Sequence, residues 1–180
     1  MSCKTVFVKN AAKRILMALL LLLVVCNVTG VTRAEAAEYI RNYFAGFPEI
    51  DSFLSETVGF AKKNGYVTTA FGRRRYIPEL SSPKKPVQAA GERIARNSPI
   101  QGTAADIIKI AMVKVYDALA EKYPDSRLIL QVHDELIIRA RKEDAEGVSE
   151  LLKECMESAA DLKVKLIVAE NTADNWYDLK

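Results

Sequence analysis

The chain has 180 residues, of which 49% are hydrophobic and 27% are charged. This length and composition are those of about one globular domain with a hydrophobic core, and they exclude a disordered chain. The three cysteines form no Cys-x-x-Cys pair, so neither a disulfide framework nor a thiolate zinc site is expected, and the pattern favours an intracellular protein. The net charge of +3 becomes informative only when it is divided along the chain.

Charge is distributed unevenly along the sequence. Residues 60–115 hold 11 Lys/Arg against 3 Asp/Glu, a net charge of +8, whereas residues 116–180 hold 9 against 15, a net charge of −6. A basic stretch followed by an acidic one indicates that one surface meets a polyanion and another does not. The alternative is that ordinary solvated helix faces happen to segregate by charge.

The first 34 residues contain no Asp or Glu. Basic residues precede the apolar run 15–26, which is the order found in a signal peptide. A helix over this run would span about 18 Å, well short of the roughly 30 Å hydrocarbon core, so a transmembrane helix is the weaker interpretation. A third alternative is that residues 1–31 are an apolar leader or an out-of-frame segment in front of a domain over residues 32–180.

Two helices are predicted at the start of this domain. Thr32 and Glu35 form a T-x-x-E capping box, so a helix is expected over 33–45. A second helix is expected over 48–64, with Gly65 as its C-cap. The inward-facing residues of the first helix are predicted to be Ala37, Ile40, Tyr43 and Phe44.

The central part of the chain predicts a hairpin and then a broken helix. Residues 66–71 and 76–77 have the pattern of two strands, joined by the turn 72–75 with the sequence Gly-Arg-Arg-Arg. Pro99 predicts a break further along, because the residue before a proline is disfavoured in the helical region. The helices on either side of this break are expected over 87–95 and from about residue 103 to a stop before Pro124.

Several hydrogen-bond donors lie around the predicted break. The donors are the guanidinium groups of Arg93 and Arg96 and the side-chain amides of Asn97 and Gln101. Spacings of three to four residues place them on one side of the helical segment. Arginine suits phosphate oxygens, while asparagine and glutamine can bond to base edges in the minor groove. The alternative for Asn97 is helix capping. The basic turn adds Arg73, Arg74 and Arg75, for which the alternative is a solvated loop.

Two adjacent carboxylates, Asp134 and Glu135, lie between apolar strands that are expected over 128–133 and 136–140. Because strands this apolar must be buried on at least one face, the acids are held at the edge of a core. Oxygen ligands of this kind suit Mg²⁺ in phosphate chemistry. The alternative is an ordinary acidic turn. A helix over 143–160 and a strand over 164–168 are expected to follow.

With these residues in place, the chain resembles the C-terminal palm and fingers portion of bacterial family A DNA polymerases. The matching stretches, in the family's order, are TRAEAAEYIRNYF, NGYVTTAFGRRRYIPEL, ERIARNSPIQGTAADIIKIAM, LILQVHDELII and NWYDLK, and they cover about residues 31–180. The resemblance implies an α+β fold, with a palm-like antiparallel sheet packed by long helices and part of a helical fingers region. It also implies a cytoplasmic DNA-directed DNA polymerase of replication and repair, whose partners are primer-template DNA and deoxynucleoside triphosphates, without stable membrane association.

The resemblance also assigns roles to individual residues. Asp134 matches the family's second metal-binding aspartate, Glu135 matches a neighbouring catalytic-site carboxylate that is less directly involved with metal, and His133 matches a residue close to the primer terminus. The residues that match contacts to the template backbone and to the minor groove at the terminal base pair are Arg93, Asn97 and Gln101. The implied reaction is nucleotidyl transfer with two Mg²⁺ ions, one activating the primer 3′-hydroxyl and the other holding the triphosphate.

The sequence departs from the family at two points that bear on activity. No acid precedes Glu35, so the first palm aspartate has no counterpart, and the leucine run stands where the nucleotide-gripping fingers helix is expected before Thr32. The chain is therefore expected to be a fragment with an incomplete nucleotide site, inactive or at least about a thousandfold slow. The missing strand would leave an open sheet edge. The alternatives are a non-catalytic DNA-binding remnant and, from residues 9–26, a secreted or membrane-tethered product.

Overall fold

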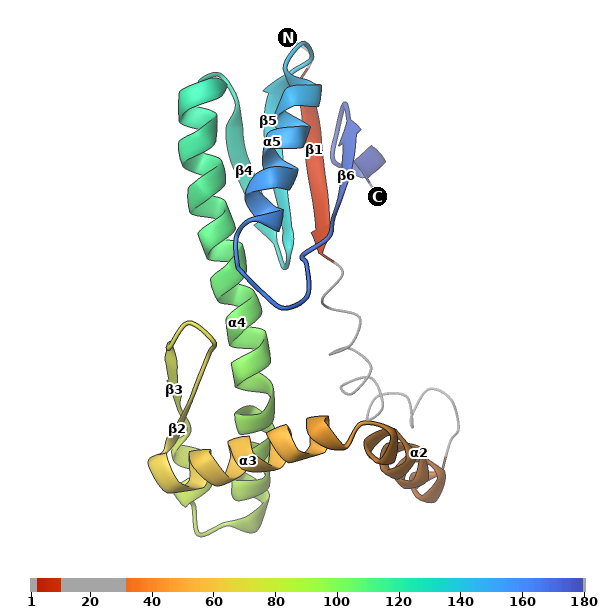
Figure 1. Ribbon diagram of the computed structural model, residues 1–180, viewed down its shortest axis with the longest axis vertical. Coiled ribbons are helices and arrows are strands. Elements are labelled where there is room, and N and C mark those ends of the chain that lie inside the picture. Colours follow the sequence, from red (N-terminus) through yellow and green to blue (C-terminus); the bar gives the residue numbers. More distant parts are fainter. Residues whose placement is uncertain (1–2, 11–31, 180) are drawn as a thin grey trace. The chain divides into compact units, whose positions relative to one another are not determined.

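A computed structural model describes residues 3–10 and 32–179 of the chain (Figure 1). The fold is α+β, as predicted, and the chain forms two compact units, one from residues 15–103 and the other from residues 1–14 and 104–180. Helix α4 contributes residues to both units. The predicted leucine-rich leader falls on residues 11–31, which lie outside the described residues, so the proposed domain boundary at residue 31 stays a prediction.

Helix α2 (Arg33–Gly46) begins at the predicted capping box. The Thr32 backbone N–H donates to Oε2 of Glu35 at 2.8 Å, and the Glu35 N–H donates to Oγ1 of Thr32 at 3.3 Å. The predicted inward face is partly wrong, because Ala36 is buried whereas Ala37 and Ile40 are exposed. The helix is packed mainly at its last turn, where rings of Tyr43, Phe44 and Phe47 contact one another, so its first turns present most of their surface to solvent.

Helix α3 (Pro48–Asn64) has the predicted bounds, since Gly65 takes the left-handed conformation (φ 78°) that ends it and donates its N–H to the carbonyl of Ala61. A two-stranded antiparallel sheet follows, formed by β2 (Tyr66–Thr68) and β3 (Arg74–Tyr76), and then the short helix η1 (Pro78–Ser81). The first strand is shorter than predicted and the second begins two residues earlier, so Arg74 and Arg75 belong to β3 and not to the turn. The buried residues of this core are Val58, Ala61, Val67, Ile77 and Ala95.

Helix α4 (Lys85–Lys122) is one continuous helix of 38 residues, so the predicted break at Pro99 is wrong. Proline removes the N–H that would bond the carbonyl four residues back, which normally disturbs a helix. Two hydroxyl groups donate to backbone carbonyls in this part of the helix. Oγ of Ser98 donates to the carbonyl of Ile94 at 2.7 Å, and Oγ1 of Thr103 donates to the carbonyl of Pro99 at 2.6 Å.

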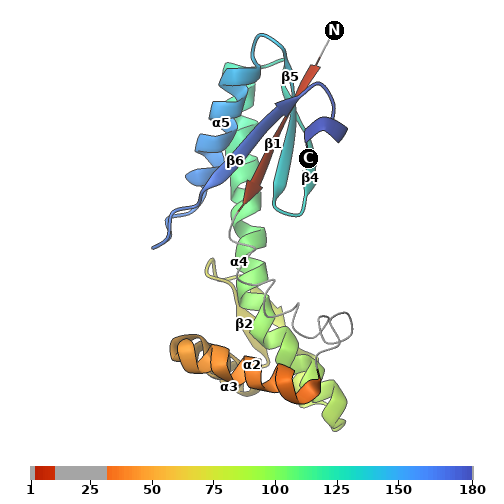
Figure 2. The same ribbon diagram turned by 90° about the vertical axis from the view of Figure 1, so that its right-hand side faces the viewer.

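The other unit contains an antiparallel sheet of four strands in the order β4-β5-β1-β6 (Figure 2). Its strands are β1 (Cys3–Asn10), β4 (Arg127–Val132), β5 (Glu135–Arg141) and β6 (Val168–Ala173). Strand β1 pairs with β5 on one side and with β6 on the other. The expected gap left by a missing strand is therefore wrong, because residues from the start of this chain occupy a central position in the sheet.

One face of this sheet is covered by α4 and by α5 (Ala145–Glu157), which lies within the predicted range. Their shared core includes Ile108, Val115, Leu119, Leu136, Ile138, Val148, Leu152 and Val168. On the opposite face, Leu179 of η2 (Tyr177–Leu179) packs against Ile137. The last strand begins at Val168 and not at residue 164, because pairing with β1 starts there and residues 164 and 167 are exposed.

A candidate nucleic-acid interface

The β2–β3 hairpin presents two different faces. Side chains of paired residues on adjacent antiparallel strands point to the same side, and successive residues alternate. Val67 pairs with Arg75 on one side, where Val67 is buried in the core shared with α3 and α4. Arg75, on the same side, therefore reaches toward α4.

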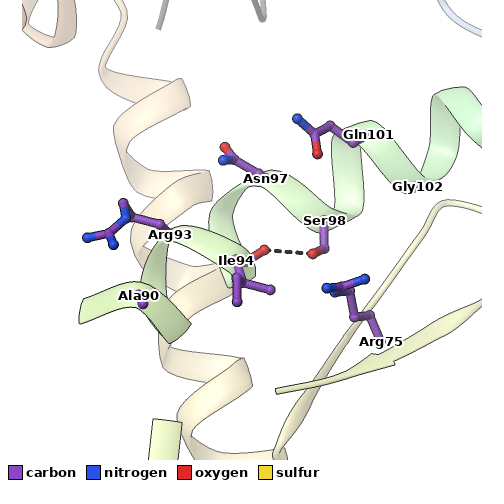
Figure 3. Close-up of a pocket in the computed structure, with 8 residues that line it drawn as sticks. All are labelled: Arg75, Ala90, Arg93, Ile94, Asn97, Ser98, Gln101 and Gly102. Atoms are coloured by element: carbon purple, nitrogen blue, oxygen red, sulfur yellow. Dashed lines mark hydrogen bonds between the residues drawn. The ribbon is translucent and has the colours of Figure 1, made fainter. Parts of the chain in front are cut away.

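A pocket of about 470 Å³ lies where this face of the hairpin meets α4 (Figure 3). Arg93, Asn97 and Gln101 are each four residues apart and project along one side of the helix. A second row with the same spacing forms the rest of the lining and consists of Ala90, Ile94, Ser98 and Gly102. Arg75 enters from β3, so the two guanidinium groups and two side-chain amides of the lining come from two elements.

The turn of the hairpin is fixed to α4 immediately beside this pocket. The backbone N–H of Ala70 donates to Oγ1 of Thr103 at 2.9 Å, and the same hydroxyl donates to the carbonyl of Pro99. Gly102 allows this close approach, because a Cβ atom at that position would lie 2.6 Å from Cγ2 of Thr69. The position of Arg75 in the pocket therefore depends on a small residue and on a hydroxyl group of the helix.

Replacing Gly102 with alanine is expected to destabilise the chain by up to about 2 kcal/mol, because the overpacking exceeds the gain in helix propensity. Thr69 has little room to yield, since its Oγ1 accepts hydrogen bonds from the N–H groups of Phe71 and Arg73. Gly59→Ala in α3 is the matched control and is expected to stabilise by up to about 1 kcal/mol, because a Cβ there meets nothing within 4 Å. Urea unfolding measures the free energy of unfolding of both variants. Stabilisation by Gly102→Ala as well as by Gly59→Ala would show that the turn does not pack against α4.

An ion pair joins α3 to α4 one residue before Arg93. Nζ of Lys62 lies 2.6 Å from Oε1 of Glu92. The hydrogen bond from Lys62 lowers the pKa of the Glu92 carboxyl below its ordinary value of 4.5. Glu92 therefore remains ionised at neutral pH and neutralises Lys62, so the positive charge available to a ligand at the pocket comes from the arginines that line it.

The structure separates the predicted binding residues into groups. Arg75, Arg93, Asn97 and Gln101 meet in the pocket, whereas Arg73 and Arg74 do not line it. The guanidinium carbon of Arg74 instead lies 4.8 Å from the centroid of the Tyr66 ring, on the other face of the hairpin. The second row of lining residues was missed by the sequence prediction, although its spacing of four residues is visible in the sequence once α4 is known to be continuous.

His133, Asp134 and Glu135 lie in the other compact unit, at the connection of β4 and β5. The turn consists of His133 and Asp134, and His133 has a positive φ of 55°, which a two-residue hairpin turn requires at its first position. Glu135 is therefore the first residue of β5, paired with Val132, and not a residue between the two strands as predicted. Asp134 and Glu135 are both half-buried, and the adjoining residues 136–138 are fully buried, as the apolar flanks predicted.

The carboxylates of this hairpin are oxygen ligands of the type that Mg²⁺ prefers, but they do not form a complete metal site. Within residues 3–10 and 32–179, no group of three or more His, Cys, Asp or Glu side chains is arranged to hold a metal ion. Strand β1, which lies beside β5, has the sequence CKTVFVKN and contributes no carboxylate. The chain thus offers Asp134 and Glu135 without a partner acid from the adjacent strand.

Guanidinium and amide donors gathered in one basic unit, in a chain whose other unit carries acids at a hairpin, are features of proteins that act on nucleic acids. The sequence profile described as DNA polymerase family A matches residues 24–178, and the chain belongs to this family. It is 49% identical over 150 residues to DNA polymerase I of Caldicellulosiruptor bescii and 45% identical over 146 residues to the thermostable DNA polymerase I of Thermus aquaticus.

The match covers most of this chain but a small part of the relatives. The match to the Caldicellulosiruptor bescii protein spans 83% of this chain and 18% of that protein. The match to the Thermus aquaticus protein spans 81% of this chain and 17% of that protein. Among solved structures, the POL domain of Pol1 from M. smegmatis, in complex with DNA primer-template and dNTP, superposes with a TM-score of 0.81 at 38% identity, covering 86% of this chain and 27% of that one. In the part of the chain that the structure describes, we find no helix with the length and apolarity to cross a membrane.

Proposed function

We propose that this chain carries the primer-template contacts of a DNA-directed DNA polymerase that serves replication and repair in the cytoplasm. The observation that supports this proposal most directly is the pocket in which Arg75, Arg93, Asn97 and Gln101 converge, in a chain of family A. Arginine pairs with phosphate oxygens, and amides can read the acceptors that every base pair displays in the minor groove. The relative from M. smegmatis was solved with DNA primer-template and dNTP.

The proposed roles follow the chemistry of each side chain. Arg93 and Arg75 bind phosphates of the template, and Asn97 and Gln101 bond to the minor groove of the terminal base pair. His133, exposed at the turn of the β4–β5 hairpin, lies close to the primer terminus. Asp134 is the metal-binding carboxylate, and Glu135 supports it.

Divalent metal ions would supply the activation of the primer hydroxyl and the neutralisation of the triphosphate in a complete polymerase. The residues of this chain fit only part of that role, because β1 lacks the second carboxylate and the leucine run replaces the fingers helix. The first candidate function is therefore that of a polymerase fragment, which binds primer-template DNA and transfers nucleotides slowly at most. This incomplete donor set is also the observation that favours the second candidate function, a non-catalytic DNA-binding remnant.

Binding of the full chain to a labelled blunt DNA duplex tests the proposal. Affinity should fall with salt, with a log–log slope of about −0.9 for each phosphate contact. Arg93→Ala should weaken binding and reduce the slope by about 1, whereas Arg96→Ala, which removes the same charge from the same helix outside the pocket, should have a smaller effect. Fluorescence anisotropy measures both variants.

Two outcomes would contradict the proposal. An affinity that is unchanged between low and moderate salt would show that phosphate contacts are absent. Equal losses from Arg93→Ala and Arg96→Ala would show that the two arginines act only through net charge, so that the pocket is not the contact surface.

A further inference from the structure

The outer face of the β2–β3 hairpin carries aromatic side chains where polar ones are expected. Tyr66 pairs with Tyr76, and Thr68 pairs with Arg74, so these four residues lie on the face opposite buried Val67. The solvated face of an antiparallel sheet is ordinarily polar. Tyr76 nevertheless has 67% of its surface exposed. The pocket on the other face of the hairpin does not use these rings.

The rings form a connected surface. The centroids of Tyr66 and Tyr76 are 5.7 Å apart, and Phe60 of α3 meets Tyr66 edge to face at 5.6 Å. Arg74 lies over the Tyr66 ring in a cation–π arrangement. We call Phe60, Tyr66, Arg74 and Tyr76 the aromatic platform. Its outermost rings, Phe60 and Tyr76, are 46% and 67% exposed, so a ligand can reach both of them.

We propose that the aromatic platform binds unpaired nucleotides of a single-stranded nucleic acid, with bases stacking on Tyr76 and its neighbours. Stacking on aromatic side chains in a basic groove is how proteins hold single strands without sequence preference. Arg74 supplies the cation beside the rings, and residues 60–115 carry a net charge of +8. An apolar protein segment on the platform would bury the Arg74 guanidinium without a counter-charge. An acidic peptide would pair with Arg74 but leave the rings without a stacking partner. A single strand can pair its phosphates with Arg74 and stack its bases on the rings.

Neighbouring residues on β3 point to opposite faces of the hairpin and so serve different proposed functions. Arg75 points to the pocket that we propose for the duplex, and Arg74 and Tyr76 point to the opposite face. The assignment rests on the proposed function, since the single strand in question is the unpaired template that continues from the duplex. One short hairpin would thus bind paired template on one face and unpaired template on the other.

The test compares binding of the full chain to two labelled probes, an oligothymidylate and a blunt duplex, by fluorescence anisotropy. Tyr76→Ala should weaken oligothymidylate binding about tenfold and leave blunt-duplex binding unchanged. Tyr76→Phe should bind as the unchanged chain does, because it keeps the ring. Tyr116→Ala is the matched control, since Tyr116 is also 67% exposed but belongs to the other unit, and it should change neither affinity.

The outcomes of this test distinguish failure of the proposed platform from failure of the proposed function. Oligothymidylate binding that is the same in Tyr76→Ala and the unchanged chain overturns the platform and leaves the proposed function standing. If the unchanged chain binds oligothymidylate but no duplex, the proposed function fails alone, and if it binds neither probe, both fail. Should Tyr76→Ala lose its folded circular dichroism spectrum, Arg74→Met replaces it, and this variant is expected to weaken oligothymidylate binding severalfold; unchanged binding overturns the platform.

Discussion

Primer extension by the 180-residue chain is expected to be at least about a thousandfold slower than by a complete family A relative, in Mg²⁺ with all four deoxynucleoside triphosphates. The reason is electrostatic. Two-metal transfer needs carboxylates from adjacent strands, and β1 supplies none beside the Asp134 hairpin. Loss of a metal carboxylate removes several kcal/mol of stabilisation, and each ~1.4 kcal/mol is a factor of ten in rate.

Gel-resolved extension at high protein concentration measures this rate, and Asp134→Asn is its internal control. Any residual activity that belongs to the chain should disappear in Asp134→Asn, because the carboxylate that we propose binds the metal is then a neutral amide. Activity that survives Asp134→Asn comes from a contaminating polymerase. Extension within tenfold of the complete relative, and dependent on Asp134, would show that this chain completes its metal site in another way and would refute the fragment interpretation.

Local signals in the sequence predicted the elements whose ends are fixed by neighbouring residues. The capping box at Thr32 placed the start of α2, and Gly65 placed the end of α3, because each acts on backbone groups within a few residues. The apolar runs on either side of Asp134 predicted two strands of a hairpin, but only β5 is buried, whereas β4 leaves Ile129 and Leu130 exposed. These signals need no knowledge of the rest of the fold.

The features that were missed depend on contacts between distant residues. Pro99 predicted a break, but α4 continues through it, with Ala95 before the proline buried in one core and Ile108 after it buried in another. The strand at residues 3–10 exists through its pairing with β5 and β6, more than 100 residues further along the chain. Its sequence carries no turn or capping signal that would announce such a pairing.

The candidate site shows the same division. The spacing of Arg93, Asn97 and Gln101 predicted that they share one side of a helix, and they do. The spacing could not show that Arg75 would join them while Arg74 turns away, because this depends on the register of a hairpin with three-residue strands. A shift of one residue would exchange the two arginines between the pocket and the aromatic platform.

Replacing Ile138 with alanine is expected to destabilise the chain by about 2–5 kcal/mol, the cost of deleting a large buried aliphatic side chain and leaving a cavity. Ile138 has 0% exposure and belongs to the core between β5, α4 and α5. Total stabilities of domains are of the order of 5–15 kcal/mol, so this is a large fraction. Because β5 begins at Glu135, directly after Asp134, its loosening should also disorder the proposed metal-binding turn.

Ile129→Ala is the matched control, since Ile129 lies on the neighbouring strand β4 with 47% of its surface exposed. It should cost less than about 1 kcal/mol, because a half-exposed side chain leaves little cavity. Urea unfolding followed by circular dichroism gives both free energies. Equal losses from Ile138→Ala and Ile129→Ala would mean that β5 is not the buried strand of the sheet, and the placement of Asp134 at the edge of a packed core would then fail with it.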